Sequence, residues 1–246
     1  MRYLILSDLH SNREALEAVI ASSQGSYDRI LCCGDVVGYG ADPDAVTEWV
    51  RANVSGIVRG NHDKACAGLE DLEWFNPLAQ QSALWTQKTT KAENLDYLRN
   101  LAMGPERVDD FDILHGSPLD EDEYLFSEQE AAQVAPYLDG SVSFFGHTHW
   151  QGGFLCHRNG VKRLNGAGGS RDEVTIELER DVRYLVNPGS VGQPRDADPR
   201  AAYLIYEPGA GLVTFRRVEY DVESAQKKII DAGLPDLLAL RLQAGV

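Results

Sequence analysis

Residues 3–10 read Tyr-Leu-Ile-Leu-Ser-Asp-Leu-His, a short apolar run followed at once by the polar residues Asp8 and His10. A run this short predicts a strand, and its lack of polar alternation predicts that the strand is buried on both faces. Ser11 and Glu14 then have the spacing of a capping box, so we expect Ser11 to cap a helix. The first structural unit is therefore a strand, a polar loop and a helix.

The same order recurs through the first half of the chain. Apolar runs at 30–33, 56–58, 111–114 and 143–145 predict further short strands, with helices between them. Short strands that alternate with helices favour a parallel sheet. After residue 150, apolar runs joined by Gly-rich turns predict a strand-rich second half. We therefore expect one α/β domain over residues 1–246, with two stacked sheets flanked by helices.

Residues 64–103 are expected to be mainly helical and to form a cap-like insertion in this domain. Leu84, Trp85, Leu95, Leu98 and Leu101 are its candidates for inward-facing side chains. The sequence leaves open whether the segment covers a cleft, forms a dimer surface or only packs. Assembly into a homo-oligomer is open for the same reason.

Composition and charge exclude several classes of protein. The formal net charge is −15, which disfavours stable binding to nucleic acid or to an anionic membrane surface. The four cysteines form no C-x-x-C pair, which favours reduced, buried thiols. No apolar run has the length of a membrane span or a signal peptide. We expect a cytoplasmic protein with no membrane partner.

Polar residues of the kind that bind metals follow five of the predicted strands. Since ligands bind beyond the carboxyl ends of the strands in open α/β sheets, these residues are expected to meet at one edge. Each alone has an ordinary explanation, such as a helix cap, a turn or a solvated histidine. Together they predict a site for Mn, Fe, Zn, Co or Ni, which carboxylate, carboxamide and imidazole ligands suit. The candidate ligands are Asp8, His10, Asp35, Asn61, His115, His147 and His149.

These motifs resemble the calcineurin-like metallophosphoesterases. The resemblance rests on Asp8-x-His10, Gly34-Asp35, Gly60-Asn61-His62-Asp63, His115-Gly116 and Gly146-His147-x-His149. The stretches 34–40 (GDVVGYG) and 187–192 (NPGSVG) are similar to the small prokaryotic, phosphodiesterase-like branch. The resemblance covers nearly the whole chain. It implies a four-layer α/β/β/α sandwich of two stacked mixed sheets.

The resemblance also implies roles for the site residues. Asp8, His10 and His149 would bind one divalent metal, and Asn61, His115 and His147 the other, with Asp35 bridging the two. His62 would act on the bound phosphate as a catalytic group, with Asp63 orienting its ring. Asn12 and Asp63 are candidates for orienting metal-bound imidazoles. Manganese is the favoured activating metal.

The expected reaction is hydrolysis of a phosphodiester by in-line attack of a metal-bridging hydroxide. The substrate would be a small or nucleotide-like phosphate ester that contacts Asn61, His62, Arg59 and Arg195. A phosphomonoesterase or protein phosphatase, a dinucleoside polyphosphate hydrolase and a non-catalytic scaffold remain alternatives. The loop 187–195 can cradle a phosphate or brace the metal-binding loops, and bracing is the favoured interpretation.

Overall fold

The computed structural model describes residues 1–246 apart from the side chain of Trp74. Two six-stranded mixed sheets form its centre, with strand orders β3-β2-β1-β11-β12-β9 and β4-β5-β6-β10-β7-β8. The strands of the first sheet are β1 (Tyr3–Leu6), β2 (Arg29–Cys32), β3 (Gly56–Ile57), β9 (Glu173–Glu177), β11 (Ala201–Glu207) and β12 (Leu212–Val218). Those of the second are β4 (Glu106–Val108), β5 (Phe111–Ile113), β6 (Val142–Phe144), β7 (Gly152–His157), β8 (Gly160–Asn165) and β10 (Arg183–Asn187).

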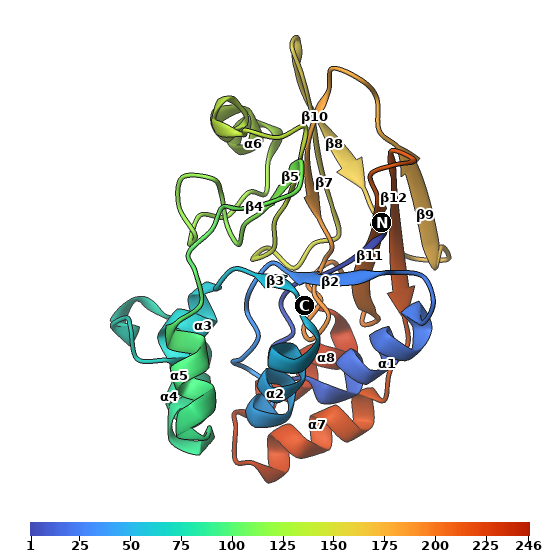
Figure 1. Cartoon of the computed structure of the whole chain (residues 1–246). Helices are drawn as coiled ribbons and strands as arrows, with labels where there is room; N and C mark the ends of the chain where they lie inside the picture. The colour runs from blue at the N-terminus through green and yellow to red at the C-terminus, as the bar shows by residue number, and fades with distance from the viewer.

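Helices cover the outer faces of both sheets. Figure 1 shows α6 beside the second sheet, while α1, α2, α7 and α8 gather below the first. Helix α1 contacts β11 and β12, and α6 contacts β7 and β8. The helices are α1 (Arg13–Ser23), α2 (Pro43–Asn53), α3 (Asn61–Cys66), α4 (Pro77–Thr89), α5 (Ala92–Arg99), α6 (Glu128–Val134), α7 (Val222–Asp231) and α8 (Asp236–Ala244), with 3-10 turns η1 (Leu72–Trp74) and η2 (Ala135–Tyr137). The predicted sandwich of two mixed sheets flanked by helices is confirmed.

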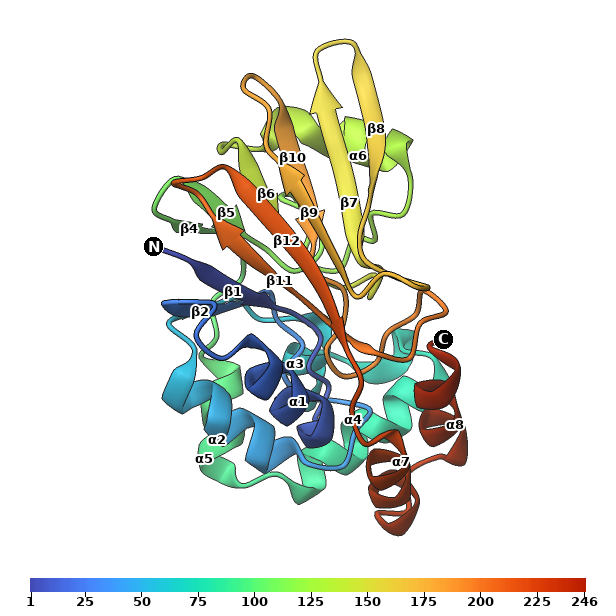
Figure 2. The same ribbon diagram turned by 90° about the vertical axis from the view of Figure 1, so that its right-hand side faces the viewer.

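Strand β1 shows why its sequence is apolar without alternation. Tyr3 and Ile5 point into the core between the two sheets, while Leu4 and Leu6 pack under α1 in a second core. Successive side chains of a strand point to opposite faces, so a strand with a core on each side needs apolar residues at every position. Figure 2 shows the two sheets facing each other, with β1 between the second sheet and the helices.

The parallel pairings place the polar loops together. β1 pairs with β2 and β2 with β3, while β5 and β10 both pair with β6, all in parallel. The loops that follow β1, β2, β3, β5 and β6 therefore leave their sheets at the same end. These loops carry the predicted metal ligands.

Two strands and one helix cap differ from the sequence-based expectation. β4 and β8 were not predicted, because both are edge strands with largely exposed, polar side chains and no apolar run. Helix α1 is capped by Asn12, whose side chain accepts from the amide of Ala15, and not by Ser11. Helix α1 begins at Arg13, so Ser11 lies one residue before the N-cap position. Ser11 belongs to the loop that follows β1, where its φ is 53°.

The segment 64–103 is mainly helical, as expected, and contains the second half of α3 together with α4 and α5. Leu98 and Leu101 are buried, but Leu84 is exposed, which corrects its assignment to the inner face. Every described helix is too short or too polar to cross a bilayer.

Candidate metal centre

The structure gathers the predicted ligands into two adjoining groups that share one carboxylate. Asp8, His10, Asp35 and His149 place their ligand atoms within 4.8 Å of one another, and so do Asp35, His115 and His147. All six residues are buried. Asp35 is the member that the two groups share.

Asn61 lies beside the second group. Its side-chain oxygen is 3.3 Å from Nε2 of His115, at the first residue of α3. The structure therefore brings all seven candidate ligands together.

Each imidazole is fixed by a backbone carbonyl. Nδ1 contacts a carbonyl oxygen in His10, His115 and His149, at 3.0, 2.7 and 2.5 Å, and Nε2 does so in His147, at 3.1 Å. A carbonyl oxygen only accepts, so that ring nitrogen must carry the proton and the other must offer a lone pair in the neutral ring. The accepting carbonyls belong to Val37, Cys33, Gln193 and Asp122.

This arrangement leaves electron pairs facing each other. Nε2 of His10 and Nε2 of His149 are 3.1 Å apart, and both rings hold their protons on the opposite nitrogen. Two lone pairs at that distance repel unless a cation lies near both. With Asp8 and Asp35 carboxylates alongside, the donor set fits divalent transition metals.

The ligand loops are held in strained backbone conformations. Five of the seven candidate ligands, Asp8, His10, Asp35, His147 and His149, have positive φ angles between 46° and 66°. Only a few per cent of non-glycine residues adopt such angles, and they concentrate at functional sites. Backbone hydrogen bonds hold this conformation, because the amides of Asp8 and His10 donate to the carbonyls of Gly34 and Asp35.

At two positions the backbone passes so close to neighbouring atoms that only glycine fits. A Cβ at Gly60 would lie 2.6 Å from the backbone nitrogen of Asp35, and one at Gly38 would lie 2.6 Å from Nδ1 of His62. Both are shorter than real side chains tolerate. Glycine at these positions therefore lets the loops after β2 and β3 close around Asp35 and His62.

Burial dominates the electrostatics of the metal-free centre. Burial raises the pKa of Asp8 to about 7, and it lowers the pKa of His62 to about 4. Burial also opposes the charge of His115, but the carboxylate of Asp35 outweighs it and raises the pKa of His115 to about 10. In the metal-free protein, protons on Asp8 and His115 therefore offset the negative charge of the buried carboxylates. Bound metal ions would take over this role.

The structure corrects the expected role of Asp63. Its carboxylate accepts hydrogen bonds from the amides of Asp35, Val36, Val37 and Gly60, at 2.9, 2.8, 3.2 and 2.9 Å. Its oxygens are directed at the backbone, so Asp63 does not orient the His62 ring. Nδ1 of His62 has no hydrogen-bond partner among the described residues.

Asn12 also differs from expectation, and it orients no imidazole. Its side chain caps α1 and donates to the carbonyl of Gly192 at 2.9 Å. Gly192 belongs to the loop 187–195, whose bracing role is confirmed. Within that loop, the hydroxyl of Ser190 and the amide of Gly192 both donate to the carbonyl of Asp8.

Arg59 and Arg195 have different surroundings. Arg59 donates twice to Glu121, at 2.9 and 2.8 Å, so its guanidinium is already engaged and the expected contact with substrate is not supported. Arg195 donates to Gln193 at 3.1 Å and lies over the ring of Tyr39, and its buried Nε has no partner among the described residues. It has no described ion pair, unlike Arg59, and it remains available to an anion.

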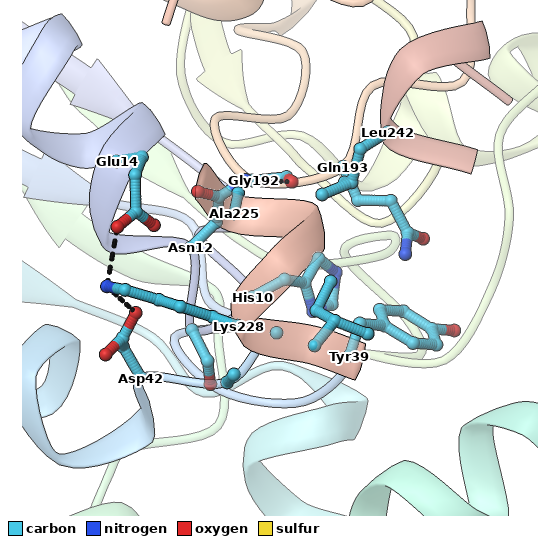
Figure 3. Close-up of a pocket in the computed structure, with 14 residues that line it drawn as sticks. His10, Asn12, Glu14, Tyr39, Asp42, Gly192, Gln193, Ala225, Lys228 and Leu242 are labelled. Carbon is cyan, nitrogen blue, oxygen red and sulfur yellow. Dashed lines mark hydrogen bonds and ion pairs between the residues drawn. The ribbon is translucent and has the colours of Figure 1, made fainter. Parts of the chain in front are cut away.

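Helix α7 packs near His10 and the first turns of α1 and α2. Lys228 bridges Glu14 at the start of α1 and Asp42 before α2, at 2.5 and 2.6 Å (Figure 3). Asp42 therefore uses its carboxylate for this ion pair, and it makes no side-chain cap on α2. A small cavity lies between this ion pair and His10 (Figure 3).

Some residues of the centre escaped the sequence analysis. Tyr39 packs 4.3 Å from the ring of His62 and 4.7 Å from that of His10, with a φ of 60°. Asp122 and Gln193 act through their carbonyls, which any residue has. Tyr39 lies in the stretch 34–40 that carries the resemblance, but nothing in the sequence gave it a role, and no sequence signal distinguishes Asp122 or Gln193.

The loops of the two stacked sheets thus deliver Asp and His side chains to two groups that share a carboxylate and could hold metal ions. A family model described as the calcineurin-like phosphoesterase superfamily domain matches residues 1–209. The chain belongs to this superfamily of hydrolases.

Similar proteins extend this result over the whole chain. A metallophosphoesterase from Sphaerobacter thermophilus is 40% identical, with a TM-score of 0.85 over 100% of this chain and 99% of that one. An uncharacterized protein of Methanocaldococcus jannaschii, MJ0912, is 37% identical over 98% of this chain and 97% of its own length. The hypothetical protein PH1004 of Pyrococcus horikoshii shares the fold, with 18% identity and a TM-score of 0.78 over 100% of this chain and 98% of that one.

Proposed function

We propose that the protein is a phosphodiesterase that uses two divalent metal ions, with manganese as the activating metal. The observation that carries this proposal is the pair of buried ligand groups joined by Asp35. Asp8, His10 and His149 bind one ion in this proposal, and Asn61, His115 and His147 bind the other. Two adjacent divalent ions supply an activated water at neutral pH and neutralise charge on a phosphate.

The substrate lies in the cavity beside the second group. This cavity has a volume of about 310 Å³, and its lining includes Asn61, His62, Phe75 and Tyr124. Phe75 comes from the segment 64–103, so part of that segment shapes the space next to the phosphate. We assign to it a role in substrate selection.

His62 acts on the ester itself. His62 is 4% exposed as a residue, and its ring lies between those of Tyr39 and Phe75, with centroids 4.3 and 5.6 Å away. The low pKa keeps the ring neutral, so it donates a hydrogen bond to the phosphate or to the leaving oxygen without adding a fixed charge. Arg195 supplies the cation that contacts a substrate oxygen.

The reaction is tested with a chromogenic phosphodiester and protein loaded with Mn²⁺. Wild type should turn over, while His62→Ala should lose about 10²–10⁴-fold in kcat and Asp35→Asn should lose nearly all activity. His157→Ala, a half-buried histidine on β7, is the matched control and should retain wild-type activity. Wild-type turnover no higher than that of the His62 and Asp35 variants would exclude catalysis. Specificity constants for monoesters and dinucleoside polyphosphates, measured in parallel, test the diester preference.

The cellular setting belongs to the same proposal. Four cysteines are buried and unpaired, which suits a reducing compartment such as the cytoplasm. The net charge of −15 suits a small anionic ester held by metals better than a nucleic-acid strand.

A further inference from the structure

Three exposed aromatic side chains form a row that begins at His147. Tyr124 stacks on the His147 ring, with centroids 3.8 Å apart and planes 27° from parallel. Phe126 stacks on Tyr124 at 5.3 Å and 6°, and Trp150 meets Phe126 edge-on at 5.6 Å and 71°. We call Tyr124, Phe126 and Trp150 the aromatic row.

The exposure of the aromatic row is unusual for its residue types. Tyr124, Phe126 and Trp150 are 43%, 40% and 44% exposed, although rings of this size are mostly buried in soluble proteins. They come from two separate loops, after β5 and after β6, so the chain fold assembles the row. A group of exposed aromatic side chains of this kind is a candidate for a binding site.

The aromatic row joins two cavities beside the proposed centre. Tyr124 lines the cavity of about 310 Å³ that contains Asn61 and His62. Phe126 and Trp150 line another of about 220 Å³, together with Thr148 and Asp196. The carboxylate of Asp196 is engaged by the guanidinium of Arg217 and by the amide of Gln151. The second cavity therefore offers ring faces, and its lining also includes the polar residues Thr148 and Asn165.

We infer that the aromatic row binds a planar aromatic group carried by the phosphate ester, namely a nucleobase, so that nucleoside phosphates are the preferred substrate class. This inference rests on the proposed function, because the phosphate must lie at the metal centre for its substituent to reach the row. A base stacks on Phe126 and lies beside Thr148 and Asn165 in the second cavity. Two copies of a chain with a net charge of −15 repel each other, which disfavours a second copy as the occupant.

The binding test does not depend on turnover. Calorimetry on the Mn²⁺-loaded protein compares the 5′-methylene phosphonate of adenosine, whose P–C bond resists hydrolysis, with the same ribose phosphonate lacking the base. Wild type should bind the adenosine compound about tenfold or more tightly, the usual effect of stacking one base. Phe126→Leu and Trp150→Leu should lose that preference. Tyr137→Leu, an equally accessible aromatic residue on η2, should keep it.

A kinetic test uses two diesters with the same leaving group, thymidine 5′-(p-nitrophenyl phosphate) and methyl p-nitrophenyl phosphate. Phe126→Leu should raise KM for the thymidine ester about tenfold relative to KM for the methyl ester, which has no base to stack. If wild type turns over neither ester, the proposed phosphodiesterase activity is refuted. The calorimetric comparison would still show whether the aromatic row binds a base.

Two results would overturn the inference. One is equal affinity of wild type for the phosphonates with and without a base. The other is a Phe126→Leu variant that keeps its base preference but changes from a dimer to a monomer by light scattering, which would make the aromatic row a contact between copies.

Discussion

The carboxylate of Asp63 holds the backbone of Asp35 in place: Oδ2 of Asp63 accepts the amide of Asp35 at 2.9 Å. The same oxygen accepts the amide of Gly60 at 2.9 Å, and Oδ1 accepts those of Val36 and Val37. One buried side chain thereby joins the loops after β2 and β3, which carry Asp35 and Asn61. Asp63 is therefore a positioning residue for the shared ligand of both metal groups.

Replacing Asp63 tests this role. In Asp63→Asn, the side-chain amide turns a donor toward backbone donors, so unfolding free energy should fall by at least about 2 kcal/mol. Mn²⁺ affinity should fall about 10–100-fold, as expected when a group that orients a ligand is lost. Calorimetric titration and denaturant unfolding measure both. Asp139→Asn, an exposed carboxylate, is the control, and equal behaviour of the two variants would contradict the assignment.

The pair of Asp35 and His115 makes the metal-free protein sensitive to alkaline pH. The pKa of His115 is raised from 6.5 to about 10 in the folded chain, since Asp35 outweighs the effect of burial. The stabilisation is complete below pH 6.5 and is lost as the pH rises toward 10. Unfolding of metal-free protein should therefore become easier between pH 7 and 9.5.

The His115→Gln variant isolates this effect. It should show a smaller loss of stability than wild type between pH 7 and 9.5, and metal-loaded wild type should behave like the variant, because a bound ion requires the neutral ring. Thermal unfolding followed by circular dichroism measures the slopes. An identical slope in metal-free wild type and His115→Gln would show that another group is responsible.

Arg59 should act through Glu121 and not through the substrate. Glu121 precedes Asp122, whose carbonyl holds the ring of His147. Arg59→Gln and Glu121→Gln should each reduce kcat, and the double variant should have a kcat no lower than that of either single variant. In unfolding free energy, the two residues should show a coupling of about 1 kcal/mol. A rise in KM for Arg59→Gln alone, with normal Glu121→Gln, would instead indicate contact with substrate.

Lys228 should stabilise the loops behind His10. Lys228→Met removes the ion pairs to Glu14 and Asp42, and its partial exposure limits the expected cost to about 1 kcal/mol. For a chain of this size that lowers Tm by about 2–4 °C. Lys227→Met, which breaks the exposed pair with Asp231 on the same helix, should change Tm much less. A larger effect from Lys227 would be contrary to the structure.

The sequence predicted those features that depend on local order. Short apolar runs followed directly by polar residues were enough to place Asp8, Asp35 and His115 at strand ends. The fold then brought these ends together, because parallel strands share an edge. Edge strands β4 and β8 were missed because pairing with a neighbour, and not apolar content, makes them strands.

Non-local contacts set the limit of that prediction. Arg59 and Glu121 are 62 residues apart, and nothing in either segment announces the pairing. Asp63 looked like a partner of the adjacent His62, but the fold directs its carboxylate at the amides of another loop. The aromatic row likewise exists only once the loops after β5 and β6 lie side by side.

Metal content tests the central claim most directly. Mass spectrometry of protein reconstituted with Mn²⁺ and freed of excess ion should give about two ions per chain in wild type, about one in His115→Ala or His10→Ala, and less than one in Asp35→Ala. A metal content below one ion per chain in Asp35→Ala is expected only if Asp35 serves both ligand groups. Asp35→Ala protein that is folded and still holds two ions would contradict the proposed centre.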